Sequence, residues 1–436
     1  MKKIILSTLL CLISVVAAAD TFGTHFADTT LRLDYILSGT NRTQHIALAR
    51  MSKTPHWYGR RTNMDHLLLR GNGQLAVLDT LTADTLYCHS FSTLFQEWQT
   101  TEEATRVERS FESPIIIPMP HHTVDVVITL TDTHNRPTAR LRHRVDPSDI
   151  LIHDRSSQPT TPWRYIRQSG PSEQCIDIAF VAEGFTDQEM PIFLAACDSS
   201  INALAAHEPY TSMMSRFNFV AIMPTSAESG VSVPRRSIWR NTALGSHYDT
   251  FYSDRYLTIP SVCRLYDLCS GLPFEHFIIL ANTEEYGGGG IYNSYTIASA
   301  RSRRAKLEVI VHEFGHSFGG LGDEYYYDDQ YETQYPSDTE PWEPNLTTLV
   351  DFNSKWADML PQGTAVPTQP LPESASEKER TQRIGVFEGG GYQSHGVYRP
   401  AQDCRMKVNE VHDFCPVCQR AIRRLINYYA PEPQQP

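Results

Sequence analysis

The sequence predicts two domains, an N-terminal all-β sandwich followed by an α/β (α+β) domain. At 436 residues, the chain is long enough for two hydrophobic cores. Up to about residue 155 it consists of short segments of alternating hydrophobicity and lacks long helical periodicity. From about residue 162, strand patterns alternate with helical ones. We therefore expect domains at 20–155 and 162–429 and a C-terminal tail at 430–436.

The strands expected in the first domain carry alternating or β-branched residues. Residues 124–130 (VDVVITL) and 138–145 (TARLRHRV) flank a turn-like segment, and RLDYILSG, QLAVLDT and TLYCHSF are similar. The polar, proline-bearing stretch RSSQPTTPW is typical of a linker.

The second domain shows buried strands and amphipathic helices in turn. CIDIAFVAEGF, NFVAIMP and HFIILAN are expected strands, and AKLEVIVHEFGHSF is an expected helix. Thr186 and Glu189 have the spacing of a capping box, which starts a helix extending toward His207. Residues 323–380 have little periodicity and predict a long, partly irregular insertion.

The N-terminus, MKKIILSTLLCLISVVAAAD, has the features of a secretory signal peptide. Two lysines, an apolar run and small residues follow one another, so we expect a signal at 1–19 that is cleaved after Ala19. The run is too short to span a bilayer comfortably, and no later stretch is long enough. The mature chain is expected to be soluble, without a transmembrane segment, and periplasmic, on the cell surface or extracellular.

The charge of the chain argues against nucleic acid as a partner. The formal net charge is −12, and there is no dense block of Lys and Arg. An anionic membrane surface is disfavoured for the same reason. The sequence does not determine the oligomeric state.

The segment VIVHEFGHSFGGLGDEYYYDD carries the chemistry that is expected of the second domain. His312 and His316 are one helical turn apart, so their Cβ atoms lie about 5–6 Å from each other, and both rings can reach one ion at about 2.0–2.1 Å. Glu313 points to the side and can take a proton from a water at the metal. This pattern predicts Zn²⁺ and metal-assisted hydrolysis of an acyl bond. The alternative is an amphipathic helix with two exposed histidines.

A catalytic zinc usually has three protein ligands, and we predict Asp323 as the third. Gly319 and Gly320 can end the helix and turn the chain back. Glu324 or a more distant carboxylate are the alternatives.

Two further segments could complete the site. Gly288, Gly289 and Gly290 would let the backbone approach an extended peptide, although a flexible loop tip explains them equally well. A tyrosine or histidine after residue 390 could donate to a developing oxyanion, and the sequence leaves open which of Tyr392, His395 and Tyr398 does so.

Eight cysteines remain after the signal peptide, three of them in CRMKVNEVHDFCPVC. A single C-x-x-C with loosely placed partners is a weak zinc motif, and export favours disulfides. We therefore expect a disulfide in this segment, with a structural zinc as the alternative.

Several motifs resemble the bacterial IgA-peptidase family of zinc metallopeptidases, in the form that carries an N-terminal β domain. They are VAEGF, GVSVP, ANTEEYGGGGIYN, VHEFGHSFGGLGDEYY, FEGGGY and DCRM…FCPVCQRAIRRL. The resemblance implies a zincin-like peptidase domain, zinc held by His312 and His316, and Glu313 as catalytic base. It also implies that Met406 is the methionine turn of such enzymes.

The function expected is that of an exported zinc endopeptidase acting on proteins outside the cell, with host immunoglobulins or glycoproteins among the possible substrates. The second hypothesis is a non-catalytic surface protein that binds host glycoproteins or glycans and has a structural metal site. An intact H-E-x-x-H favours the first.

Overall fold

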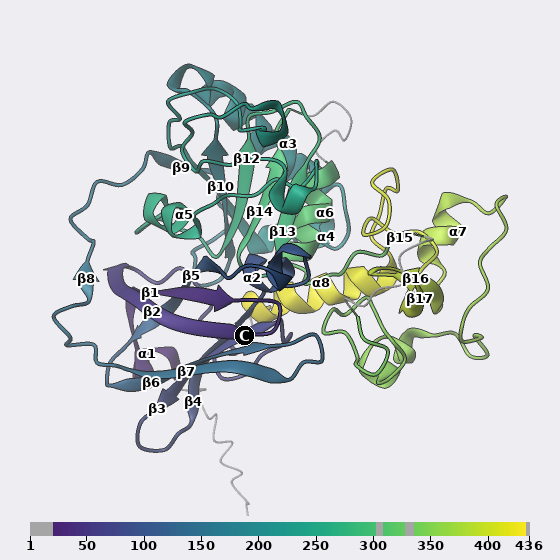
Figure 1. Cartoon of the computed structure of the whole chain (residues 1–436), viewed down its shortest axis with the longest axis horizontal. Coiled ribbons are helices and arrows are strands. Elements are labelled where there is room, and N and C mark those ends of the chain that lie inside the picture. The colour runs from purple at the N-terminus through teal and green to yellow at the C-terminus, as the bar shows by residue number, and fades with distance from the viewer. Residues whose placement is uncertain (1–20, 302–307, 328–334, 433–436) are drawn as a thin grey trace, which may run out of the picture.

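The computed structural model describes residues 21–301, 308–327 and 335–432 (Figure 1). The expected signal peptide at 1–19 lies outside the described residues, as do residues 433–436 of the expected tail. Within the described ranges, no helix is both long and apolar enough to cross a bilayer.

Two four-stranded sheets face each other in the N-terminal part. Their orders are β5-β1-β2-β8 and β4-β3-β6-β7, and only β2 and β8 pair in parallel. Leu33 and Ile117 from one sheet and Val77 and Val126 from the other lie in one buried cluster. The prediction of an all-β sandwich is therefore confirmed. Its elements are α1 (Thr21–His25), β1 (Phe26–Gly39), β2 (Gln44–Pro55), β3 (Gly73–Asp79), β4 (Thr85–Phe91), α2 (Leu94–Trp98), β5 (Arg109–Pro120), β6 (Val124–Thr131), β7 (Pro137–Val145) and β8 (His153–Asp154).

The second part is built on a six-stranded mixed sheet of order β13-β14-β12-β10-β11-β9. The four inner strands run parallel, and the two edge strands run antiparallel to their neighbours. The inner strands are almost continuously hydrophobic because both faces of the sheet are covered. The six strands are β9 (Trp163–Arg167), β10 (Ile176–Glu183), β11 (Phe217–Ile222), β12 (His276–Ala281), β13 (Gly288–Ile291) and β14 (Tyr295–Ser299).

Each face of this sheet has its own core. Phe180 packs in one core with residues of α3 (Met190–Ala205), α4 (Tyr210–Met213), α6 (Glu308–Ser317) and α8 (Pro416–Tyr429). Val181 points to the other core, which contains α5 (Val262–Leu268) and irregular segments such as the one around Leu257. The expected α/β domain is thus confirmed.

The expected insertion after α6 is mostly irregular. Described residues 335–376 contain turns, bridges and short 3₁₀ turns but no named strand or α-helix. The residues on either side of this irregular stretch form a three-stranded sheet of order β15-β17-β16. Its strands are β15 (Tyr326–Tyr327), β16 (Phe387–Gly390) and β17 (Tyr392–Arg399). Helix α7 (Glu377–Gln382) lies beside this sheet (Figure 1).

The two parts pack against each other through buried polar contacts. The Arg60 guanidinium lies between the rings of Tyr87 from β4 and Tyr428 from α8, 4.7 and 4.9 Å from their centroids. Arg32 on β1 bonds to Asp267 on α5 at 2.7 Å. In Figure 1, α8 crosses the middle of the molecule and α2 lies beside β13 and α6. The N-terminal part therefore borders the helix that carries the histidines.

Candidate active site and metal centre

Helix α6 and the turn after it bring three potential ligands together. The Nε2 atoms of His312 and His316 are 3.1 Å apart, and Asp323 Oδ1 lies 3.1 and 3.2 Å from them. A tetrahedral ion with bonds of about 2.0–2.1 Å separates its ligands by about 3.3 Å. The three donor atoms therefore have the spacing that a zinc-sized ion requires, and the His₂Asp donor set suits such an ion.

The Nδ1 atoms of the two histidines determine the orientation and the tautomer of each ring. His312 Nδ1 lies 2.9 Å from the carbonyl oxygen of Arg405, and His316 Nδ1 lies 2.6 Å from that of Leu321. A carbonyl oxygen cannot donate, so each Nδ1 must carry a hydrogen, and in the neutral rings the Nε2 lone pairs then face each other and Asp323. Such an arrangement requires a positive charge at its centre.

Without an ion, protons on the imidazole Nε2 atoms supply this positive charge and donate to Asp323. Burial would lower the pKa of His316, but the Asp323 carboxylate raises it to about 9. Burial would raise the pKa of Asp323, but the charge of His316 and hydrogen bonds from both imidazoles hold it far below its usual range. Asp323 is therefore present as a carboxylate.

A glycine turn delivers Asp323 to the histidines. Gly320 has φ +59°, a left-handed conformation, and its N–H donates to the carbonyl of His316 at 3.0 Å. The Tyr392 hydroxyl donates to Asp323 Oδ2 at 2.5 Å, which leaves Oδ1 to face the histidines. Glu324, the rival ligand, is fully buried in a different cluster with three cysteines. The geometry thus favours Asp323 as third ligand.

Glu313 lies beside the three potential ligands, against the glycines of β13. A Cβ on Gly288 would be only 2.8 Å from Glu313 Oε1. Burial raises the pKa of Glu313, while the charges of His312 and His316 lower it, and the net shift is upward. A carboxylate with a raised pKa is a better proton acceptor near neutral pH.

The glycines of β13 are required by close packing on both of their sides. A Cβ on Gly290 would lie 2.9 Å from His316 Cβ, and one on Gly289 would lie 2.9 Å from the ring of Tyr256. On the side away from β14, the Gly288 N–H donates to the carbonyl of Arg255, and the Gly288 carbonyl accepts from the N–H of Leu257. That part of the sheet edge is occupied by the chain itself, so a substrate role for Gly288, Gly289 and Gly290 stays a prediction.

The sequence matches known families over both parts of the chain. Residues 165–382 and 373–426 match the family described as IgA Peptidase M64, and residues 21–142 match the one described as Peptidase M64 N-terminus. The chain belongs to the IgA peptidase M64 family. The resemblance inferred from the motifs is confirmed, and membership makes the protein a metallopeptidase that acts on a peptide substrate. No curated protein matches the chain.

Two side chains near Glu313 and the histidines were not predicted as site residues. Glu97, on α2 of the N-terminal domain, accepts a hydrogen bond from the Tyr256 hydroxyl at 2.5 Å. Burial raises its pKa to about 7, and the charges of His316 and Glu313 also act on it. Its segment, FQEWQT, contains no motif, so only the packing of the two domains identifies it.

The second unpredicted side chain is Tyr286. Its hydroxyl accepts from Asn409 Nδ2 at 2.8 Å, and the tyrosine's pKa is raised by burial and by the charge of Glu313. Since Tyr286 directly precedes the glycine run, the motif around it was the signal available in the sequence.

The three predicted oxyanion donors lie in different environments. Tyr392 is bonded to Asp323 as described. His395 is exposed on β17 with its Nδ1 3.3 Å from Glu388. Tyr398 packs partly against the core, and its backbone pairs with Thr347. Only Tyr392 directly contacts a predicted ligand.

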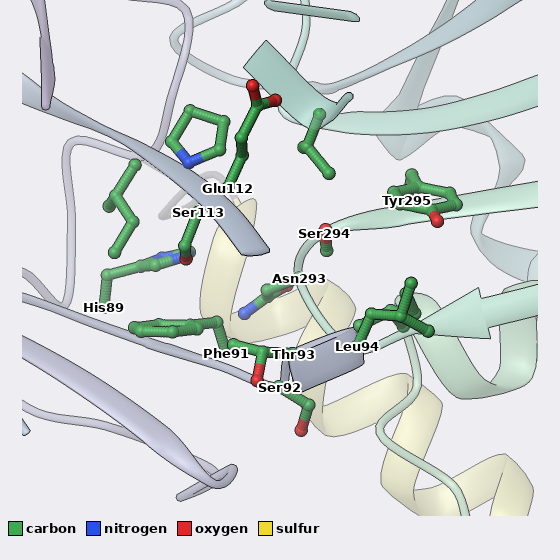
Figure 2. Close-up of a pocket in the computed structure, with 14 residues that line it drawn as sticks. His89, Phe91, Ser92, Thr93, Leu94, Glu112, Ser113, Asn293, Ser294 and Tyr295 are labelled. Carbon is green, nitrogen blue, oxygen red and sulfur yellow. The ribbon is translucent and has the colours of Figure 1, made fainter. Parts of the chain in front are cut away.

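A small cavity lies at the junction of the two domains (Figure 2). It is lined by, among others, Phe91, Ser92, Glu112, Asn293 and Tyr295, and none of the predicted site residues borders it. Its volume of about 30 Å³ suits one or two waters and is too small for a peptide.

Proposed function

We propose that the protein is a zinc endopeptidase that hydrolyses peptide bonds in proteins outside the cell. The observation that carries this proposal is the convergence of His312, His316 and Asp323 at 3.1–3.2 Å, with Glu313 beside them. Zinc is proposed because two imidazoles and a carboxylate form a three-ligand set typical of catalytic zinc sites.

When bound, zinc would supply Lewis acidity that polarises a carbonyl and lowers the pKa of a water. The chain's own residues would provide the proton transfers. Glu313 accepts the proton of the attacking water and then gives it to the leaving amine, and its raised pKa suits both steps. Arg405 and Leu321 keep the two imidazoles oriented through their backbone carbonyls.

Tyr286 is proposed as the donor to the developing oxyanion. Its oxygen already accepts from Asn409, so its own O–H proton is available for a further acceptor. A fixed hydroxyl near Glu313 can stabilise negative charge that forms on the carbonyl oxygen during attack.

We further propose that an extended substrate lies along the edge of β13 near Gly289 and Gly290, beyond the part of the edge at Gly288 that Arg255 and Leu257 occupy. Support comes from the three consecutive glycines of this strand and from its place at the edge of the sheet. Glu97 would then give the N-terminal domain a part in substrate selection.

The domain limits near 155 and 162 are also proposals, based on the end of β8 at Asp154 and the start of β9 at Trp163. Export rests on the N-terminal sequence and leads us to propose a periplasmic, cell-surface or extracellular location.

The test compares wild-type protein with Glu313→Gln on a mixture of secreted host proteins that includes immunoglobulins. Mass spectrometry would identify new peptide ends, which we expect with the wild type and at rates about 10²–10⁴-fold lower with the variant. Equal zinc contents in the two proteins provide the control. Ends that appear equally with both proteins would overturn the role of Glu313, and their absence with zinc-loaded wild type would favour the binding-protein hypothesis.

A further inference from the structure

A second group of potential metal ligands lies behind the catalytic centre. Cys404, Cys415, Cys418 and Glu324 bring their ligand atoms within 4.8 Å of one another. The three cysteines and Glu324 are each 0 % exposed. All eight cysteines of the described residues are free thiols, so the disulfide expected in this segment is not formed in the structure.

We propose that these four residues bind a structural zinc ion. The Cys404 and Cys418 sulfurs are 3.8 Å apart. A tetrahedral zinc with Zn–S bonds of about 2.3 Å separates its sulfurs by about 3.8 Å, whereas a disulfide requires about 2.05 Å. Four protein ligands and complete burial leave no open position, which is the property of a structural zinc site.

The carboxylate of Glu324 provides independent evidence for a cation. Its Oε1 accepts from Asn345 Nδ2 at 3.0 Å and lies 3.1 Å from Cys418 Sγ, but its buried Oε2 has no hydrogen-bond partner among the described residues. The ion pairs of the described residues include none to Glu324. Buried carboxylates are normally paired or bound to a metal.

The basic side chains near Glu324 make their hydrogen bonds to other groups. Arg399 Nη1 donates to the carbonyls of Glu388 and Gly389, both at 2.6 Å. Lys407 Nζ donates to Gln402 and is paired with Asp403. Neither side chain bonds to Glu324, so its charge has to be compensated either by a bound cation or by a proton on the carboxyl itself.

A disulfide accounts for the cluster less completely than a metal does. Any pairing uses two of the three cysteines and leaves the third thiol and the unpartnered Glu324 oxygen buried together. A metal uses all four ligands. The backbone N–H of Cys415 also donates to Cys404 Sγ at 3.2 Å, a contact that stabilises a thiolate ligand.

The ion would hold the two segments that orient the catalytic ligands. Cys404 immediately precedes Arg405, whose carbonyl accepts from His312 Nδ1 at 2.9 Å. Glu324 immediately follows Asp323, and its N–H donates to the carbonyl of Met406 at 2.8 Å. The proposed zinc site is therefore distinct from the His312–His316–Asp323 site, and it holds in place the segments that carry Asp323 and the Arg405 carbonyl.

The test measures metal content and cobalt spectra on the purified full chain. We expect two zinc ions per wild-type molecule, one in His316→Ala and one in Cys418→Ser. Cobalt-loaded His316→Ala should keep the intense thiolate-to-cobalt charge-transfer absorption, and Cys418→Ser should lose most of it. Cys263→Ser, at a half-buried cysteine outside the cluster, is the matched control and should keep both ions.

The proposal is overturned if cobalt-loaded His316→Ala shows no thiolate absorption, or if peptide mapping under non-reducing conditions shows a disulfide between two of the three cysteines. Should Cys418→Ser fail to fold, the isosteric Glu324→Gln replaces it, with a shifted cobalt spectrum and faster zinc loss to a chelator as the expected result. These readouts do not depend on peptidase activity, so failure of the proposed function and failure of this site are separable.

Discussion

The sequence offers Tyr392 as one of three candidate oxyanion donors, but its contact in the structure indicates a different role. Its hydroxyl donates to the Asp323 oxygen that does not face the histidines. Removing such a partner of a ligand typically weakens metal binding about 10–100-fold. We expect Tyr392→Phe to lower zinc affinity of the His312–His316–Asp323 site by that factor, as measured by competition with a chromophoric chelator.

The control for this change is Tyr252→Phe, because Tyr252 is 86 % exposed. It should bind zinc like the wild type. An unchanged affinity in Tyr392→Phe would show that the hydrogen bond does not support the ligand.

Tyr286 permits a test of transition-state stabilisation. If its hydroxyl donates to the oxyanion, Tyr286→Phe should lower kcat about 10²–10³-fold and leave KM and zinc content nearly unchanged, because the contact is made mainly in the transition state. The matched variant is Tyr398→Phe, on β17, which should retain wild-type kcat. A rise in KM alone would assign Tyr286 to substrate binding instead.

At this scale, the sequence predicted what lies close together along the chain. His312, Glu313 and His316 are within five residues on one helix, and Asp323 follows after a single glycine turn. Tyr286 directly precedes the glycine run, which was a signal available in the sequence, whereas Glu97 reaches the site through domain packing, which leaves no local spacing to recognise. The partner of Tyr392 was missed for the same reason.

Among the elements, β13 packs closely against α6 at the site. An alanine at Gly290 would overlap the carbonyl oxygen of Glu313 and place its Cβ 2.9 Å from His316 Cβ. Overpacking of this kind costs about 1–3 kcal/mol. We expect Gly290→Ala to lower the thermal unfolding midpoint and to reduce kcat/KM, since either the strand or the catalytic helix must move.

Gly363→Ala serves as the control for the effect of losing a glycine. Gly363 has φ +82° but open space around its Cβ, so alanine there introduces backbone strain without a clash. It should lower the unfolding midpoint and keep full kcat/KM. Equal losses of activity in both variants would refute the packing argument.

Most strands predicted from sequence are present, and the omissions have physical causes. Residues 124–130 and 138–145 alternate clearly and form β6 and β7. β5 contains three prolines and β2 is almost entirely exposed or half-buried, so neither gave a clear strand pattern. β9 lies directly after the linker and is mostly exposed or half-buried, as expected of an edge strand.

For the whole molecule, the contact between the domains explains why the N-terminal part belongs to the peptidase. It supplies Glu97 to the edge of the proposed active site and anchors α8 through Arg60 and Tyr428. Because α8 begins with Cys415 as its N-cap, the same helix links the domain interface to the proposed second metal site. Sequence composition alone could not predict this connection, since each partner comes from a distant part of the chain.

The same interface makes the stability of the whole molecule depend on pH through Glu275, whose carboxylate accepts from the Arg60 N–H at 2.7 Å. Burial and the charge of Asp177 raise its pKa to about 8 against the opposing effect of Arg60, while the adjacent His276 is kept neutral by burial, which lowers its pKa to about 3. Between about pH 4.5 and 8 the folded protein therefore holds a proton on Glu275 that the unfolded chain has released, so the contribution of Glu275 to stability falls as pH rises through this window. His276 has the opposite effect only below its ordinary pKa of 6.5, so of these two groups Glu275 acts alone above that pH. We expect the thermal unfolding midpoint of the wild type to decrease from pH 6 to pH 8, and Glu275→Gln to remove part of that decrease.

Glu173→Gln, at a half-exposed side chain nearby, is the control and should follow the wild type. Parallel curves for all three proteins would mean that Glu275 is already ionised in the folded state.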